Sequence, residues 1–315
     1  MTMEEVCMII PSDKPTEYNY ILESNETGKL SDILSRRYGF STRILRNIKR
    51  GGILEVNGAP ARVISSAVAG DKVRIVLPRE KLDADPVDSP FDIISEDSEI
   101  LAVNKSPGVV SHPTKRHQLD TLANYAAAYA ALRGDSYKLR FVNRLDMDTS
   151  GVIIIAKNKF VHHYIQSRMQ GPDVEKTYTV WAEEAPDRLF PDSGTIDLPI
   201  GRPDPVSIRR CVMEDGQRAV THYKVLERVP GAVRLEIVLE TGRTHQIRVH
   251  LAAAEHPIIG DPLYNPDSCE RFGLNRQALH ASRLKLPLPK AGILELQAEL
   301  PDDFIQLENR LRGKI

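Results

Sequence analysis

Two carboxylates that could do chemistry, Asp146 and Asp148, lie in the segment NRLDMDTSG directly before the apolar run VIIIA. Loops at strand ends often carry catalytic groups, and an ionised carboxylate can act as a nucleophile. A D-x-D pair can also bind a metal ion. The following Thr149-Ser150-Gly151 is typical of a turn, which Asp148 could stabilise by accepting hydrogen bonds from backbone amides. For the two aspartates taken alone, the residues favour the turn over the metal site.

A second cluster, LETGRTHQIRVHL, combines basic side chains with a helical pattern. Thr244 is a candidate N-cap, and His245 and Arg248 would then share one face of the helix. Ile247 and Leu251 would face the protein interior. A buried carboxylate needs a cationic partner to remain ionised, and an arginine supplies one with a fixed fork geometry. This cluster can therefore supply the partner of a catalytic carboxylate.

Tyr178 and the motifs that the chain lacks narrow the chemistry further. Tyr178 occupies a period-two position in the strand-type run EKTYTVWAE, which by itself predicts core packing with the hydroxyl at the rim. The sequence contains no GxxxxGK[ST], GxGxxG after a strand, HExxH or GxSxG, so nucleotide, zinc-protease and hydrolase sites are not expected. The histidine pairs His162-His163 and His245-His250 have no matching ligand set. We expect neither a metal nor a small-molecule cofactor.

The composition is that of an ordinary globular protein. Of the 315 residues, 41% are hydrophobic and 27% are charged, and the formal net charge is -1, which is compatible with about two domains. Cys7, Cys211 and Cys269 are far apart, which favours a reducing compartment over a disulfide framework. The apolar runs are far shorter than the about 20 residues that span a bilayer, and the first residues do not resemble a signal peptide. We expect a cytoplasmic protein with no membrane partner.

A basic segment differs from this neutral total. Residues 28–50 carry seven basic side chains against one acidic side chain, Asp32, which gives a local charge of +6. The segment also contains two amphipathic patterns, GKLSDILSRRYG and STRILRNIKRGG, that predict short helices. A charge run is usually a solvated helix face, but an imbalance of this size favours a phosphate-binding surface. The basic residues are Lys29, Arg36, Arg37, Arg43, Arg46, Lys49 and Arg50.

The pattern along the chain predicts three segments. Residues 18–78 predict a small α/β domain, in which short strands and a turn at Asn57-Gly58 follow the two helices. Residues 79–92 are acidic and contain two prolines, which predicts a linker. Residues 93–315 contain many β-type runs that are not spaced as regular βαβ units. For them we expect an α+β domain with a mixed, mainly antiparallel sheet.

Three motifs in this order, NRLDMDTSG, EKTY and TGRTHQIRVHLAAAEHPIIGDPLY, resemble those of the RluA-type RNA pseudouridine synthases. VNKSPGVVSHP resembles the start of that catalytic domain, and LPIGR followed by RAVTHYKVL resembles its middle. Residues 18–78 resemble the small RNA-binding domain first described in a small-subunit ribosomal protein. The resemblance covers nearly the whole chain, and it implies a pseudouridine synthase domain at 93–315.

The resemblance implies roles for individual residues. Asp146, in RLDxxTSG, would be the catalytic nucleophile, and Arg248, in HQIR, would pair with it. Tyr178, in K-x-Y, would lie against the target base. Arg144 would enter the RNA stack or contact the displaced nucleotide. These side chains need no redox partner or phosphate donor, because the reaction only breaks a glycosidic bond, turns the uracil and rejoins it through carbon.

Three further residues belong to the expected site. Arg243 and His245, in the third motif, are expected to contact RNA. The family usually has a histidine where this chain has Asn143, which weakens any role for position 143. The aspartate, the tyrosine and both arginines are all present, so an active enzyme is the leading interpretation.

We therefore expect an isomerase that acts on structured RNA, in the first place large-subunit ribosomal RNA, as a monomer. The target base would be flipped out of its stack, at a cost of a few kcal/mol. A tRNA substrate, a non-catalytic RNA-binding or ribosome-assembly factor, and a metal-dependent sugar transferase remain as alternatives. In the leading interpretation Asp146, Tyr178 and Arg248 converge in one basic cleft, and Asp148 points away into its turn.

Overall fold

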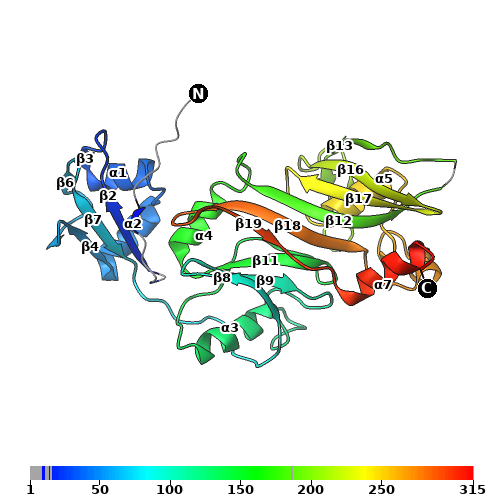
Figure 1. The fold of residues 1–315 in the computed structure, drawn as a ribbon, viewed down its shortest axis with the longest axis horizontal. Helices are drawn as coiled ribbons and strands as arrows, with labels where there is room; N and C mark the ends of the chain where they lie inside the picture. The colour runs from blue at the N-terminus through cyan, green and yellow to red at the C-terminus, as the bar shows by residue number, and fades with distance from the viewer. Residues whose placement is uncertain (1–8, 11–13, 15, 186, 315) are drawn as a thin grey trace.

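The computed structural model describes residues 9–10, 14, 16–185 and 187–314. In the described N-terminal part, five strands form an antiparallel sheet in the order β1-β2-β7-β4-β5, with α1 and α2 beside it (Figure 1). The elements of this part are β1 (Ile9–Ile10), β2 (Glu17–Ile21), β3 (Gly28–Lys29), α1 (Leu30–Arg36), α2 (Thr42–Gly51), β4 (Ile53–Val56), β5 (Ala59–Pro60), β6 (Ser66–Ala67) and β7 (Lys72–Val76).

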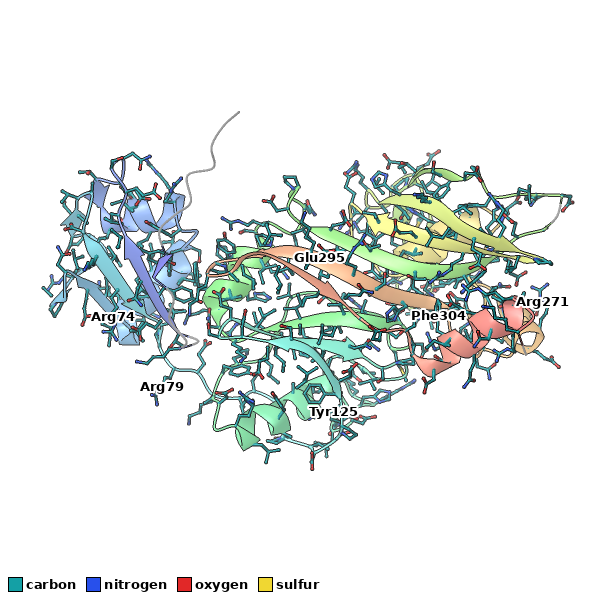
Figure 2. All side chains as sticks on the ribbon, viewed as in Figure 1. Arg74, Arg79, Tyr125, Arg271, Glu295 and Phe304 are labelled. Atoms are coloured by element: carbon teal, nitrogen blue, oxygen red, sulfur yellow. The ribbon has the colours of Figure 1, made fainter. Side chains whose placement is uncertain are left out.

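Local sequence signals explain this N-terminal part. The Ser41 hydroxyl caps α2 by accepting a hydrogen bond from the Ile44 amide. Asn57 and Gly58 both have positive φ, 52° and 81°, and connect β4 to β5 in the tight turn that the Asn-Gly pair predicts. Arg74, labelled in Figure 2, lies on β7 and forms ion pairs with carboxylates on the two neighbouring strands. The sheet is therefore joined by side chains as well as by backbone hydrogen bonds.

The larger part is a ten-stranded sheet in the described residues, with the path β13-β16-β17-β12-β18-β11-β9-β8 and with β10 and β19 paired to β11 and β18. Its strands are β8 (Asp92–Glu96), β9 (Ile100–Lys105), β10 (Arg140–Phe141), β11 (Ser150–Ala156), β12 (Glu175–Glu183), β13 (Ser193–Asp197), β16 (Val220–Val229), β17 (Ala232–Leu239), β18 (Leu279–Leu288) and β19 (Gly292–Gln297). The short pair β14 (Ile200–Gly201) and β15 (Cys211–Val212) lies apart from it. The helices are α3 (Leu122–Leu132), α4 (Lys159–Gln166), α5 (Gln246–Ala253), α6 (Asp267–Phe272) and α7 (Asp302–Leu311).

The order of the strands confirms the expected fold class. Among the strand pairs of this sheet in the described residues, β11 with β18 is parallel and the others are antiparallel. All seven residues of β11 are buried, as expected for an apolar run at the centre of a sheet. Gly151 allows the parallel pair, because a Cβ at this position would lie 2.2 Å from the Ala281 carbonyl oxygen. The protein is thus mixed and mainly antiparallel.

Helices complete separate cores on the large sheet. Leu122 and the alanines of α3 pack with Ile153 and Ile155 of β11. Ile247 and Leu251 of α5 pack with β12 and β17, which confirms that this pair faces the interior. Phe304 on α7, labelled in Figure 2, is fully buried in the same core. The helices therefore cover the sheet and fix the ends of its strands.

Residues 79–91 contain no helix or strand and lie along the larger part. Leu82 and Phe91 pack against the core under α3. The backbone carbonyl oxygens of Glu80 and Asp85 accept hydrogen bonds from Ser136 and from Asn124 of α3. The segment is thus packed in place, while the domain boundaries themselves stay a prediction.

None of the described helices has the length and apolar character that a membrane crossing needs. Cys211 and Cys269 are half-buried free thiols, and Cys7 lies outside the described residues. These thiols are unpaired in the described part of the chain.

His280 on β18 lies beside β11, the strand that follows the loop containing Asp146. Its ring is fully buried, Nε2 is 3.2 Å from the Ala298 carbonyl oxygen, and Nδ1 is 2.9 Å from the Ser150 hydroxyl. Because a carbonyl oxygen only accepts, Nε2 carries the proton and Nδ1 accepts from Ser150. Burial lowers the pKa of His280 to about 4. The folded protein therefore holds this histidine neutral.

We predict a loss of stability in mild acid that depends on His280. Since its folded pKa lies below the unfolded value, its contribution is present above about pH 6.5 and is lost as the pH falls towards 4. The shift corresponds to about 3 kcal/mol. Urea unfolding across this range should show a smaller loss in His280→Gln than in the wild type. The same pH dependence in both proteins would contradict the assignment.

Candidate active site

Asp146 lies in the loop between β10 and β11, with Leu145 buried beneath it. Its side chain is 21% exposed and lines a cleft of about 1210 Å³. One carboxylate oxygen of Asp146, Oδ2, is 3.2 Å from Nη1 of Arg248 and 3.7 Å from Nε2 of His245. The loop therefore presents a carboxylate that is paired on one side and open to the cleft on the other.

The backbone of this loop is held at successive carbonyl groups. The Asp146 carbonyl accepts a hydrogen bond from the Thr149 amide at 3.1 Å. The next carbonyl, of Met147, accepts from the buried Lys105 ammonium at 2.7 Å. The Asp148 carbonyl accepts from Arg276 at 3.3 Å. These contacts fix the direction in which the Asp146 side chain leaves the backbone.

Arg248 connects the loop that carries Asp146 to a buried aspartate. Nε and Nη2 of Arg248 each donate to the carboxylate of Asp261 at 2.7 Å, while Nη1 faces Asp146. Asp261 is fully buried and also accepts from the amides of Leu263 and Tyr264. Burial opposes the charged form of Arg248, but hydrogen bonds and the charges of both aspartates raise its pKa above the ordinary value. The guanidinium is therefore fixed and charged.

The start of α5 differs from the sequence-based prediction. The N-cap is His245, in the left-handed conformation with φ 58°, and its side chain makes no capping bond, so the expected Thr244 cap is wrong. The buried side-chain oxygen Oε1 of Gln246 accepts hydrogen bonds from the Arg243 backbone amide and the Thr241 hydroxyl. A sparsely populated conformation of a non-glycine residue is held only by such surroundings. The left-handed backbone conformation of His245 turns its ring toward Asp146.

His245 and Arg248 share Tyr264 as a neighbour. The Tyr264 hydroxyl lies 3.0 Å from Nδ1 of His245, and the Arg248 guanidinium lies 5.1 Å from the Tyr264 ring centroid. Burial lowers the pKa of His245, against the opposing attraction of Asp146. The His245 ring thus lies between the Asp146 carboxylate and the Tyr264 hydroxyl.

Tyr178 on β12 lines the same cleft as Asp146 and Arg248. It is half-buried, and burial, followed by the charge of Asp146, raises the pKa of its phenol. Its ring packs against the cores on both sides of β12. The structure thus brings Asp146, Tyr178 and Arg248 together in one cleft.

Asn143 and Arg144, three and two residues before Asp146, have different surroundings. Arg144 is exposed and lines the cleft, and its guanidinium makes no ion pair with any described residue. The Asn143 amide donates to the Val152 carbonyl at 2.8 Å and accepts from the Ile154 amide at 2.9 Å. Asn143 therefore joins the loop to β11 with both of its polar atoms. This is a structural use of the position at which the family usually has histidine.

The predicted RNA-binding residues lie in two places. Arg243 and His245 line the cleft with Arg144, and Nε of Arg243 donates to the Arg218 carbonyl. Arg36 lines a second cavity, next to α4. The exposed basic residues of α2 are Arg43, Arg46, Lys49 and Arg50.

Arg37 is an exception among the predicted RNA-binding residues. Its guanidinium forms ion pairs with Glu23 at 2.9 Å and with Glu26 at 3.3 Å. Glu26 is buried and also accepts a hydrogen bond from the Tyr38 hydroxyl. Arg37 is therefore already engaged within the N-terminal part, unlike the exposed residues of α2.

The expected direction of the Asp148 side chain, away from the cleft, stays a prediction. Asp148 lines the cleft, and the hydrogen bond that closes the turn runs from the Thr149 amide to the Asp146 carbonyl. The Thr149 hydroxyl accepts from the side-chain amide of Gln277 at 2.9 Å, so the segment before β18 holds the turn. In the described chain, no group of three or more His, Cys, Asp or Glu side chains is placed to hold a metal ion.

Several site residues were not found from the sequence. Asp261, Lys105, Arg276, Gln277 and Tyr264 hold Asp146, Arg248 or the loop backbone, although they lie in distant segments. The one available signal was the GDPLY end of the third motif, which contains Asp261 and Tyr264. Its spacing gave no reason to pair it with Arg248.

The described lining of the cleft is largely basic, and its carboxylates are those of Asp146, Asp148 and Glu240. Besides Arg144, Arg243 and Arg248, its lining includes Lys176, Arg202 and Arg210. The arrangement suits an anionic substrate, because cations attract phosphates while the carboxylate of Asp146 remains open to the cleft.

Comparison with known proteins gives a consistent picture. Residues 99–253 match the model of the RNA pseudouridylate synthase family. The chain is 38% identical over 278 residues to the uncharacterized RNA pseudouridine synthase YlyB of Bacillus subtilis, covering 86% of this chain and 89% of that protein. It is 34% identical over 285 residues to ribosomal large subunit pseudouridine synthase D of Neisseria meningitidis, covering 86% and 75%.

A solved structure agrees with the fold. The human RNA pseudouridylate synthase domain containing 4 matches with a TM-score of 0.56 and 27% identity, over 70% of this chain and 93% of that chain. The protein therefore belongs to the RNA pseudouridine synthase family, and its activity is that of an RNA-modifying isomerase.

We predict that the pair Arg248–Asp261 is a major source of stability. Asp261→Asn keeps the shape but removes the buried charge, and breaking such a pair costs about 3 kcal/mol. Chemical denaturation should show this loss in the free energy of unfolding. Asp192→Asn is the matched control, because Asp192 pairs with Arg228 but is 92% exposed and should contribute little. Equal losses in the two variants would contradict the prediction.

Proposed function

We propose that the protein converts uridine to pseudouridine in structured RNA with Asp146 as the nucleophile. The observation that supports this proposal is the Asp146 carboxylate, fixed 3.2 Å from the buried Arg248 guanidinium and open to a basic cleft. Asp146 attacks the ribose or the uracil while the bond between C1′ and N1 breaks. The uracil then turns, C5 bonds to C1′, the bond between Asp146 and the substrate breaks, the C5 proton is released and N1 gains a proton. No external energy source is required.

The target nucleotide leaves its stack to reach the cleft. Unstacking costs a few kcal/mol, which contacts to the flipped nucleotide must offset. Tyr178 supplies a ring for stacking on the uracil, and Arg144 supplies an unpaired guanidinium for the gap in the RNA. His245 and Arg243 are positioned to contact the backbone around the nucleotide.

Large-subunit ribosomal RNA is the substrate that we propose. Several relatives, including one from Haemophilus ducreyi, are named ribosomal large subunit pseudouridine synthase D. The exposed arginines and lysine of α2 add sequence-independent phosphate affinity, which suits a large folded RNA. We place this reaction in the cytoplasm and assign it to a monomer. Mapping pseudouridines in total RNA with and without the protein tests the substrate, and a signal confined to tRNA would overturn it.

We predict that Asp146→Asn lowers the rate of pseudouridine formation by at least about 10³-fold, because a neutral amide is a poor nucleophile. RNA affinity should stay close to that of the wild type, since the phosphate contacts are unchanged. Tritium release from RNA labelled at C5 of uridine measures the reaction, and filter binding measures affinity.

Asp148→Asn is the matched control in the same loop and should retain most of the activity. Full activity of Asp146→Asn would exclude the nucleophile, and no activity in the wild type would favour a non-catalytic RNA-binding factor. Loss of wild-type activity in EDTA would instead favour the metal-dependent alternative.

A further inference from the structure

A second cavity, of about 600 Å³, lies between the N-terminal part and α4. Figure 1 shows α4 at the end of the large sheet that faces α1 and α2. One wall includes Ser35, Arg36 and Phe40, and the other includes His163, Ser167 and Arg168. Residues far apart in the sequence therefore form one groove, called here the interdomain groove.

The two walls are fixed by buried packing. The rings of Phe40 and Phe160 are stacked with centroids 3.9 Å apart, and both are almost fully buried. A Cβ at Gly39 would lie 3.2 Å from the Tyr164 ring, so the surfaces are in close contact. Beside them, the Asn158 amide donates to the Tyr18 hydroxyl at 2.8 Å. The interdomain groove is thus preformed in the folded protein.

The chemistry of the interdomain groove suits phosphate. Arg36 and Arg168 line it, and neither forms an ion pair with any described residue. The Arg168 guanidinium lies 3.6 Å from the centroid of the Tyr164 ring, which orients its plane. His163 and the Ser167 hydroxyl add further polar groups, and none of the described residues lining the groove is acidic. Nη1 of Arg168 donates to the Tyr164 carbonyl and to the Ser167 hydroxyl, both at 3.2 Å, which holds the guanidinium at the groove. Arginines without competing carboxylates are a phosphate-binding arrangement.

The interdomain groove adjoins the active-site cleft. Gln166, Met169 and Gln170 line the cleft, whereas Ser167 and Arg168, from the same turn after α4, line the groove. One turn of backbone therefore separates the two cavities. An RNA strand that runs from the cleft across this turn would reach the groove.

We propose that the interdomain groove binds the sugar-phosphate backbone that flanks the target uridine, with phosphates on Arg36 and Arg168. This inference rests on the proposed function, since it extends the RNA path from the cleft to the N-terminal part. The N-terminal part would thereby contact the same RNA strand that enters the cleft.

Binding of labelled oligouridylates to the wild-type protein, Arg36→Glu and Arg168→Gln tests the proposal. We expect each variant to bind an oligomer of about 16 nucleotides about tenfold more weakly, and to bind one of about 4 nucleotides as the wild type does. The salt dependence of binding should fall by about 0.7 per lost phosphate contact. Arg62→Glu is the control, because Arg62 is exposed in the same part of the chain but does not line the groove.

Unchanged affinity of both variants for the long oligomer would overturn the proposal, as would equal weakening by Arg62→Glu. Equal weakening for the short oligomer would also overturn it, because the effect would then be general electrostatics. Arg36 is exposed, so its variant decides the matter even if loss of the Arg168–Tyr164 stack destabilises the other. The binding result is separate from tritium release, whose absence in the wild type would sink the proposed function alone.

Discussion

The buried guanidinium of Arg248 is the interaction on which the site depends. It spans from the fully buried Asp261, at 2.7 Å, to the partly exposed Asp146, at 3.2 Å. A lone buried charge is costly, but paired aspartates and a fixed fork geometry offset that cost. The pairing joins α5, the loop after it that carries Asp261, and the loop that carries Asp146. Displacement of any of these three segments would move Asp146 with respect to the cleft.

The loop that carries Asp146 is held by a second set of buried basic side chains that donate to backbone carbonyls. Lys105 donates to the carbonyls of Ser106, Val109 and Met147, and Arg276 donates to that of Asp148. Carbonyl groups in a loop must find donors when they are buried, and cations provide strong ones. The Asp146 carboxylate takes no part in these contacts to the loop backbone. The loop is therefore rigid in its backbone while its side chain faces the cleft.

The N-terminal part contributes geometry as well as charge. Its net positive segment would bind RNA anywhere, but the Phe40–Phe160 stack fixes it against α4. A fixed partner places its phosphate contacts at a set position relative to Asp146, whereas a flexible tether would spread them. Affinity from the interdomain groove would then favour RNA strands already in register with the cleft.

The sequence determined what local patterns encode. It predicted the Asn57-Gly58 turn, the mixed, mainly antiparallel fold and the three motifs that contain Asp146, Tyr178 and Arg248. Only the tertiary structure decided that Asp261 holds Arg248, that His245 replaces Thr244 at the start of α5, and that Phe40 docks on Phe160. Local propensities act between near neighbours, whereas burial decides which distant donor meets which acceptor.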